Sequence, residues 1–203
     1  MHEYNILERG KPLPHASKAI ILLHGRGGSA QDILMLANEF CDETFYIAAP
    51  QATNRTWYPY SFLAPTNQNE PWLSSAIDVV KRLIDKTTQV LGVENVYLMG
   101  FSQGACLTLE VAARFAQPYA GVAAFTGGLI GDSLNSSNYK GDFEGSKIFI
   151  GNSDNDPHVP SDRSEESKRQ LQKMGADVLL KVYPNMPHTI IPDEIDSVKK
   201  MMF

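Results

Sequence analysis

Residues 100–104, Gly-Phe-Ser-Gln-Gly, match the pattern G-x-S-x-G, with a short apolar run before them and a helical pattern after them. In this context Ser102 is expected at a sharp turn between a strand and a helix, which lifts its hydroxyl above the edge of a sheet. The glycines leave room for the turn, and the helix N-terminus favours negative charge developing beside the serine. The segment predicts a nucleophile; the alternative is a glycine-rich turn with an incidental serine.

A serine hydroxyl is a poor nucleophile unless a neighbouring base takes its proton. Of the five histidines, only His158 and His188 follow Ser102. In α/β hydrolases the catalytic residues follow the chain order serine, acid, histidine. His188 lies directly after the last predicted strand and hence at the same sheet edge as Ser102. We therefore expect it to act as general base and then as general acid.

The imidazole needs a carboxylate that fixes its tautomer and stabilises the imidazolium. Two candidates, Asp154 and Asp156, follow the apolar run 147–150. Periodicity does not choose between them. The other aspartate could orient the loop by accepting backbone N–H bonds, as aspartate does in turns.

Ester hydrolysis also builds charge on a carbonyl oxygen, and two backbone N–H groups usually stabilise it. One is expected from Gln103, the residue after the nucleophile. The glycine-rich segment 23–29 can supply the other, because glycines let the backbone turn its N–H groups inward. This segment lacks the Lys-Ser/Thr of a phosphate-binding loop, so phosphate binding is a poor alternative.

These groups must be positioned by alternating strands and helices. Short apolar runs predict strands at 19–23, 45–49, 96–100, 122–126, 147–150 and 178–183. Helical spacing predicts helices at 30–39, 72–91, 103–115, 161–174 and 193–202. This alternation predicts one α/β domain over residues 1–203, with a mostly parallel sheet flanked by helices. The long loops 51–71 and 126–145 are too short for a large cap domain.

Composition narrows the class of protein. The net charge is −5, which argues against a nucleic-acid partner. No apolar run is long enough for membrane insertion, and no signal peptide is visible, so we expect a cytoplasmic protein. Two cysteines do not form a disulfide framework; Cys106 is expected inside, and Cys41 has no predicted role. The spacing of acidic and histidine residues matches no metal motif, so we expect neither metal nor cofactor.

Four segments in the right order resemble the phospholipase/carboxylesterase family, which includes the acyl-protein thioesterases. They are residues 24–28 (His-Gly-Arg-Gly-Gly), 100–104, 156–160 (Asp-Pro-His-Val-Pro) and 186–188 (Met-Pro-His). The resemblance covers roughly residues 19–203 and implies the α/β-hydrolase fold. It implies that Asp156 is the triad acid and that Arg26 and Gln103 supply the oxyanion-hole N–H groups.

The resemblance also implies that Trp57 lies near the acyl site. Three departures concern the substrate: residues 56–59 read Thr-Trp-Tyr-Pro, Pro187 directly precedes His188, and Asn152-Ser153 replace the histidine-glycine pair common in the family. Aromatic and apolar residues after the second strand either line an acyl pocket or pack the loop on itself. The candidates for substrate binding are Trp57, Tyr58, Leu63, Val159 and Met186.

The sequence thus predicts a serine hydrolase that cleaves small-molecule carboxylic esters through an acyl-serine intermediate. Short to medium acyl chains are expected, with lysophospholipids and thioesters as further substrate classes. The competing hypothesis is a non-catalytic or single-turnover small-molecule receptor on the same scaffold, because fold does not fix function. Acyl chain length, leaving group and oligomeric state are left open.

Overall fold

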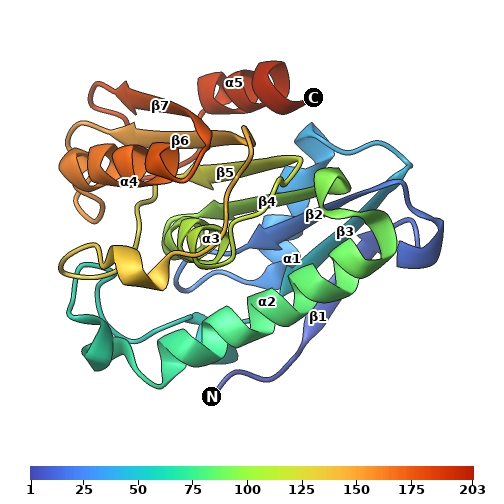
Figure 1. The fold of residues 1–203 in the computed structure, drawn as a ribbon, viewed down its shortest axis with the longest axis horizontal. Helices are drawn as coiled ribbons and strands as arrows, with labels where there is room; N and C mark the ends of the chain where they lie inside the picture. The colour runs from blue at the N-terminus through green and yellow to red at the C-terminus, as the bar shows by residue number, and fades with distance from the viewer.

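The computed structural model describes residues 1–203 and contains a seven-stranded sheet with helices on both faces (Figure 1). The strands are β1 (Ile6–Gly10), β2 (Lys18–Leu23), β3 (Phe45–Pro50), β4 (Val96–Phe101), β5 (Gly121–Phe125), β6 (Lys147–Ser153) and β7 (Asp177–Tyr183). The helices are α1 (Ala30–Ile33), α2 (Trp72–Leu91), α3 (Gln103–Arg114), α4 (Ser161–Lys173) and α5 (Pro192–Met202). The strand order is β1-β3-β2-β4-β5-β6-β7, and every neighbouring pair is parallel except β1 with β3.

The central strands are apolar throughout because both faces of the sheet are covered. Successive residues of β2 enter different cores: Ile21 packs on the side of α2, α3 and α4, whereas Ile20 packs on the side of α1 and α5. Figure 1 shows the long helix α2 crossing the same face as α3 and α4. Strands buried on both faces lose the usual alternation of polar and apolar residues.

The six predicted strands are present, and the sequence missed β1. This strand is an edge strand with a half-buried to exposed sequence, Ile-Leu-Glu-Arg-Gly, so it carries no continuous apolar run. The predicted helix at 30–39 is partly wrong: α1 makes one turn and continues as a 3₁₀ helix over Leu34–Glu39. Burial of Leu34 and Ala37, three residues apart, suits the 3₁₀ repeat as well as the α-helical one.

Parallel strands direct their carboxyl ends to one edge of the sheet, where loops can gather functional groups. The connections after β2, β3, β4, β5, β6 and β7 all leave from this edge. They include every segment for which the sequence predicts chemistry. Separately, none of the helices combines the length and the apolar composition needed to cross a bilayer.

Candidate active site

Ser102 lies at the junction of β4 and α3 with φ 54° and ψ −119°, a backbone conformation that a residue with a side chain rarely adopts. Its N–H donates to Phe125 O of the neighbouring strand at 2.9 Å, which helps to hold the turn. A Cβ at Gly100 would lie 2.4 Å from Gly104 O, and one at Gly104 would lie 2.1 Å from Leu23 O. The pattern of glycines therefore follows from close backbone approach on both sides of the serine.

The structure brings Ser102, His188 and Asp156 into one hydrogen-bonded line. His188 Nε2 lies 2.8 Å from Ser102 Oγ, and His188 Nδ1 lies 2.6 Å from Asp156 Oδ2. The three side chains come from the ends of β4, β7 and β6, which meet at the same sheet edge. With Nδ1 protonated toward the carboxylate, Nε2 is free to accept the serine proton.

Asp156 is buried and accepts two further hydrogen bonds. Its Oδ1 receives the N–H groups of His158 at 2.8 Å and Val159 at 2.9 Å. Burial is the largest single influence and acts to raise the pKa of Asp156. The hydrogen bonds from His188 and from the two N–H groups together outweigh it and lower the pKa below its usual value. The carboxylate is therefore held ionised beside the imidazole.

The other candidate acid, Asp154, is exposed and does not contact His188. Its Oδ1 accepts the N–H of Asn185 at 2.8 Å, in the turn that leads to His188. The two aspartates thus divide the roles that the sequence left open. Asp156 contacts the imidazole, and Asp154 orients the segment that carries it.

The glycine-rich segment after β2 surrounds a buried histidine, His24, whose two nitrogens are both used. Nδ1 lies 2.8 Å from Gly25 O, and Nε2 accepts the N–H of Ala52 at 3.1 Å. A neutral ring protonated at Nδ1 can donate to Gly25 O and accept the N–H of Ala52 at Nε2. Burial lowers the pKa of His24, which favours this neutral ring. His24 therefore supports the loop and takes no place beside Ser102.

The two predicted oxyanion donors have backbone N–H groups without an acceptor in the protein. Arg26 lies in the loop after β2, and Gln103 is the first residue of α3, where a helical N–H has no intrahelical partner. Their positions leave both groups available to a substrate oxygen. The assignment as donors stays a prediction.

Their side chains have a second role, which the sequence did not indicate. The Arg26 guanidinium donates to four oxygen atoms between 2.8 and 3.0 Å away: Thr56 Oγ1 and the carbonyls of Tyr58, Pro59 and Tyr60. The Gln103 amide accepts Trp57 N–H at 2.9 Å and donates to Tyr58 O at 2.8 Å. Segment 56–60 is thereby held both by Arg26, in the loop after β2, and by Gln103, the residue after Ser102.

A cavity of about 640 Å³ opens beside Ser102. Its volume lies in the range typical of small-molecule sites. The lining residues are Arg26, Tyr58, Pro59, Tyr60, Ser61, Phe62, Ser102, Gln103, Cys106, Pro157, His158, Val159 and His188. Two of the five predicted pocket residues, Tyr58 and Val159, are among them.

The other three predicted pocket residues are not among those that line this cavity. Trp57 is fully buried, and its Nε1 donates to His24 O at 2.8 Å, so it packs beneath the glycine-rich loop. Leu63 packs against the core cluster that includes Leu73 and Ile77. Met186 is buried outside the lining. In the aromatic segment after β3, Tyr58 therefore lines the cavity, whereas Trp57 and Leu63 pack against other parts of the protein.

His158 is a lining residue to which the sequence assigned no function. Its ring lies edge-on to His188, with 5.0 Å between the ring centroids. No group of three or more His, Cys, Asp or Glu side chains is arranged to hold a metal ion.

Comparison with known proteins agrees with this geometry. The family model described as Phospholipase/Carboxylesterase matches residues 7–202. A probable carboxylesterase SOBER1-like of Arabidopsis thaliana is 27% identical over 140 residues, covering 68% of this chain and 53% of that protein. Acyl-protein thioesterase 1 of Saccharomyces cerevisiae is 31% identical over 133 residues, covering 62% and 55%. The matches thus span about half the length of these two relatives.

Among solved structures, a phospholipase/carboxylesterase of Dyadobacter fermentans is 48% identical with a TM-score of 0.96, and the match covers 99% of this chain and 97% of that one. The esterase PE8 is 23% identical with a TM-score of 0.80, covering 97% and 96%, which shows a shared fold.

Proposed function

The chain belongs to the phospholipase/carboxylesterase family, and on that premise we propose that it hydrolyses carboxylic esters through an acyl intermediate on Ser102. The observation that carries the proposal is the line of hydrogen bonds from Ser102 Oγ through His188 to Asp156, at 2.8 and 2.6 Å. A nucleophile, its base and the group that orients the base are then all in place.

In the first half of the reaction, His188 Nε2 takes the proton of Ser102 as the oxygen attacks the ester carbonyl. Asp156 stabilises the imidazolium that forms and stays ionised itself. The carbonyl oxygen becomes negative and is stabilised by the N–H groups of Arg26 and Gln103. When the carbon–oxygen bond to the alcohol breaks, His188 gives its proton to the departing oxygen, and Ser102 carries the acyl group.

In the second half, water enters and His188 takes one of its protons as the water oxygen attacks the acyl carbon. The bond to Ser102 Oγ then breaks, and the proton returns from His188 to the serine. One ester and one water become one acid and one alcohol, and the protein is unchanged. A thioester can follow the same steps with sulfur as the leaving atom.

The cavity supports substrates of modest size. It combines aromatic and apolar lining from Tyr58, Phe62 and Val159 with the polar groups of the catalytic line. We take short to medium acyl esters as the substrates and leave the alcohol or thiol portion to experiment. The acyl-protein thioesterase relative makes thioesters a sensible second series.

The direct test is turnover of p-nitrophenyl acetate and butyrate by the wild type and by Ser102→Ala. Loss of the nucleophile should lower kcat by a factor of about 10⁴ or more. A fluorophosphonate probe should label the wild type at Ser102. Equal rates for the two proteins would remove Ser102 as nucleophile. Absence of labelling together with thermal stabilisation by small esters would support a receptor instead.

A matched pair of variants tests the acid. Asp156→Asn should lower kcat by about 10⁴-fold, because an amide cannot hold the imidazole in its working tautomer. Asp154→Asn should cost less than about tenfold, because its amide oxygen can still accept the N–H of Asn185. The reverse order of effects would assign the triad acid to Asp154.

A further inference from the structure

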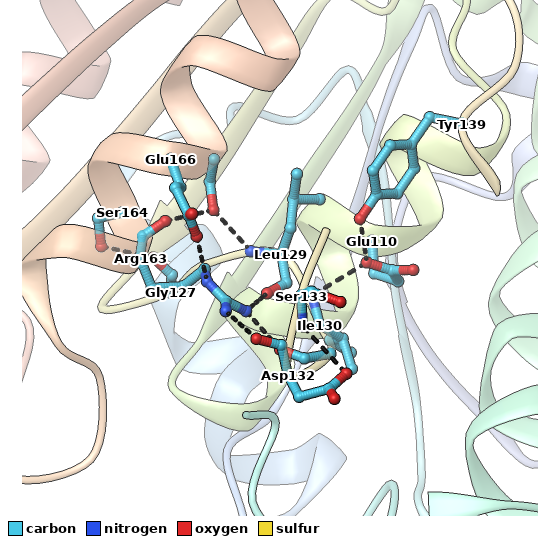
Figure 2. Close-up of polar contacts among 12 residues, drawn as sticks. Glu110, Gly127, Leu129, Ile130, Asp132, Ser133, Tyr139, Arg163, Ser164 and Glu166 are labelled. Atoms are coloured by element: carbon cyan, nitrogen blue, oxygen red, sulfur yellow. Dashed lines mark hydrogen bonds and ion pairs between the residues drawn. The ribbon is translucent and has the colours of Figure 1, made fainter. Parts of the chain in front are cut away.

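The loop after β5, residues 127–132, is held by a buried arginine of α4 (Figure 2). The Arg163 guanidinium donates to the carbonyl oxygens of Leu129 at 3.1 Å, Gly131 at 2.5 Å and Asp132 at 3.2 Å. Its Nε also lies 2.9 Å from the carboxylate of Glu166, on the exposed side of the same helix. A single planar side chain thus holds three carbonyl groups of this one loop.

Three more side chains complete the fixation of this loop. Figure 2 shows Ser164 and Glu110 approaching it from α4 and α3. Ser164 Oγ donates to Gly127 O at 2.9 Å, Ser167 Oγ accepts Leu129 N–H at 2.8 Å, and Glu110 Oε2 accepts Ile130 N–H at 3.0 Å. Residues 127–131 are buried, so water cannot replace a lost partner without a change of structure.

This loop lies directly behind the wall of the cavity. A Cβ at Gly128 would lie 2.8 Å from Arg163 Cγ and 3.4 Å from Phe62 Cε2, so both side chains approach the loop backbone closely at this glycine. The N–H of Gly131 also donates to Phe62 O at 2.7 Å. Phe62 lines the cavity beside Ser102, whereas Arg163 does not.

We infer that Arg163 is a specificity-determining positioning residue: by fixing loop 127–132 it braces Phe62 and so limits the length of acyl group that the cavity accepts. The inference rests on the esterase function proposed above. Arg163 acts through Gly128 and Gly131, without contact with the substrate. When the brace is removed, the ring can retreat and the cavity can lengthen.

The test compares kcat/KM for p-nitrophenyl acetate and p-nitrophenyl octanoate in Arg163→Met, which keeps the stem of the side chain and removes all its donors. The ratio of octanoate to acetate should rise about tenfold, the scale of one or two methylene groups in an apolar pocket. The rate with acetate should change less than about twofold, because the short chain does not reach the brace. KM for octanoate should carry most of the change.

Two variants serve as controls. Glu166→Gln removes the exposed carboxylate partner and keeps every bond from Arg163 to the loop, so its ratio should equal that of the wild type. Ser167→Ala releases Leu129 N–H and loosens the same loop by another route, so its ratio should rise. If Arg163→Met does not fold, the Ser167→Ala ratio decides the question.

A double-mutant cycle tests the route through the ring. In a Phe62→Ala background, Arg163→Met should leave the ratio unchanged, because the wall that it braces is already gone. An unchanged ratio in folded Arg163→Met, or an equal rise with and without Phe62, would overturn the inference. Either result leaves the proposed function standing as long as Ser102→Ala loses turnover, so the two failures are distinguishable.

Discussion

Two arginines hold the two loops that flank the cavity, and they do so in different surroundings. Arg26 fixes segment 56–60 through four oxygens, and Arg163 fixes loop 127–132 through three. Arg26 is exposed at the mouth of the cavity, whereas Arg163 is 8% exposed. The bonding pattern is similar, but the access of water is not.

The difference concerns what replaces the arginine when it is lost. Around Arg26, Pro59 and Tyr60 are exposed, and Tyr58 O keeps its bond from Gln103, so water and the amide can satisfy the oxygens. Around Arg163, the carbonyls of Leu129 and Gly131 are buried and have no substitute. We therefore expect the exposed arginine to affect mainly chemistry and the buried one mainly stability and selectivity.

The largest effect expected from this comparison is on the free energy of unfolding. Arg163→Met should lower it by about 3 kcal/mol, because buried carbonyl groups lose their partners. Arg26→Met should lower it by less than about 1 kcal/mol, because water takes over. Urea unfolding of both variants measures the difference. Equal losses would show that burial does not separate the two loops.

The cost of a buried group without a partner also applies to a carboxyl group away from the cavity, that of Glu194. Glu194 Oε2 accepts Ile191 N–H, but its Oε1 has no hydrogen-bond partner. Glu194 forms no ion pair, because Lys181 pairs with the neighbouring Asp193. Burial raises the pKa of Glu194 from 4.5 to about 7. Between these two values the folded chain holds a proton that the unfolded chain releases, so stability should fall as pH rises from about 4.5 to about 7 and then level off.

Glu194→Gln should remove this loss, because the amide stays neutral and can still accept Ile191 N–H. At pH 8 the variant should be more stable than the wild type by about 3 kcal/mol, and at pH 4 the two should nearly coincide. Thermal unfolding across this pH range is the measurement. Parallel stability curves for the two proteins would show that Glu194 is not the titrating group.

The smallest effect that we expect from the comparison is on the kcat of a variant of the exposed arginine, Arg26. Arg26→Met should lower kcat for p-nitrophenyl acetate by about tenfold, because the loop that presents the Arg26 N–H loses its attachment to segment 56–60. The size of this effect is below the loss expected on removing a donor outright. Initial rates at saturating substrate give kcat. No change would mean that the backbone of residue 26 holds its place without the side chain.

Most of the fold could be predicted from the sequence, because the patterns that indicate strands and helices lie within single elements. Apolar runs and helical spacing report burial along one element, so six strands and the long helix α2 were found where they lie. Strand β1 was not predicted, because this edge strand is half-buried to exposed and has no continuous apolar run. The order Ser102, then an aspartate, then His188 was equally readable from the chain.

The parts of the site that were not predicted depend on neighbours distant in sequence. Trp57 and Tyr58 are adjacent aromatic residues, yet only Tyr58 lines the cavity. Segment 161–173 is polar almost throughout, so its sequence does not separate the buried Arg163 from the exposed charged residues of the same helix. Its burial follows from a loop more than thirty residues earlier in the chain.

The sequence by itself determined the turn at Ser102, because glycines on either side are required by the steric limits of one short segment. It also determined that a base and an acid would follow from later strands. Only the tertiary structure decided that Asp156 faces the imidazole while Asp154 orients the loop, and which arginine is buried. Backbone sterics and periodic burial act between near neighbours, whereas hydrogen-bond partners and exclusion of water are set by segments that meet only when the chain folds.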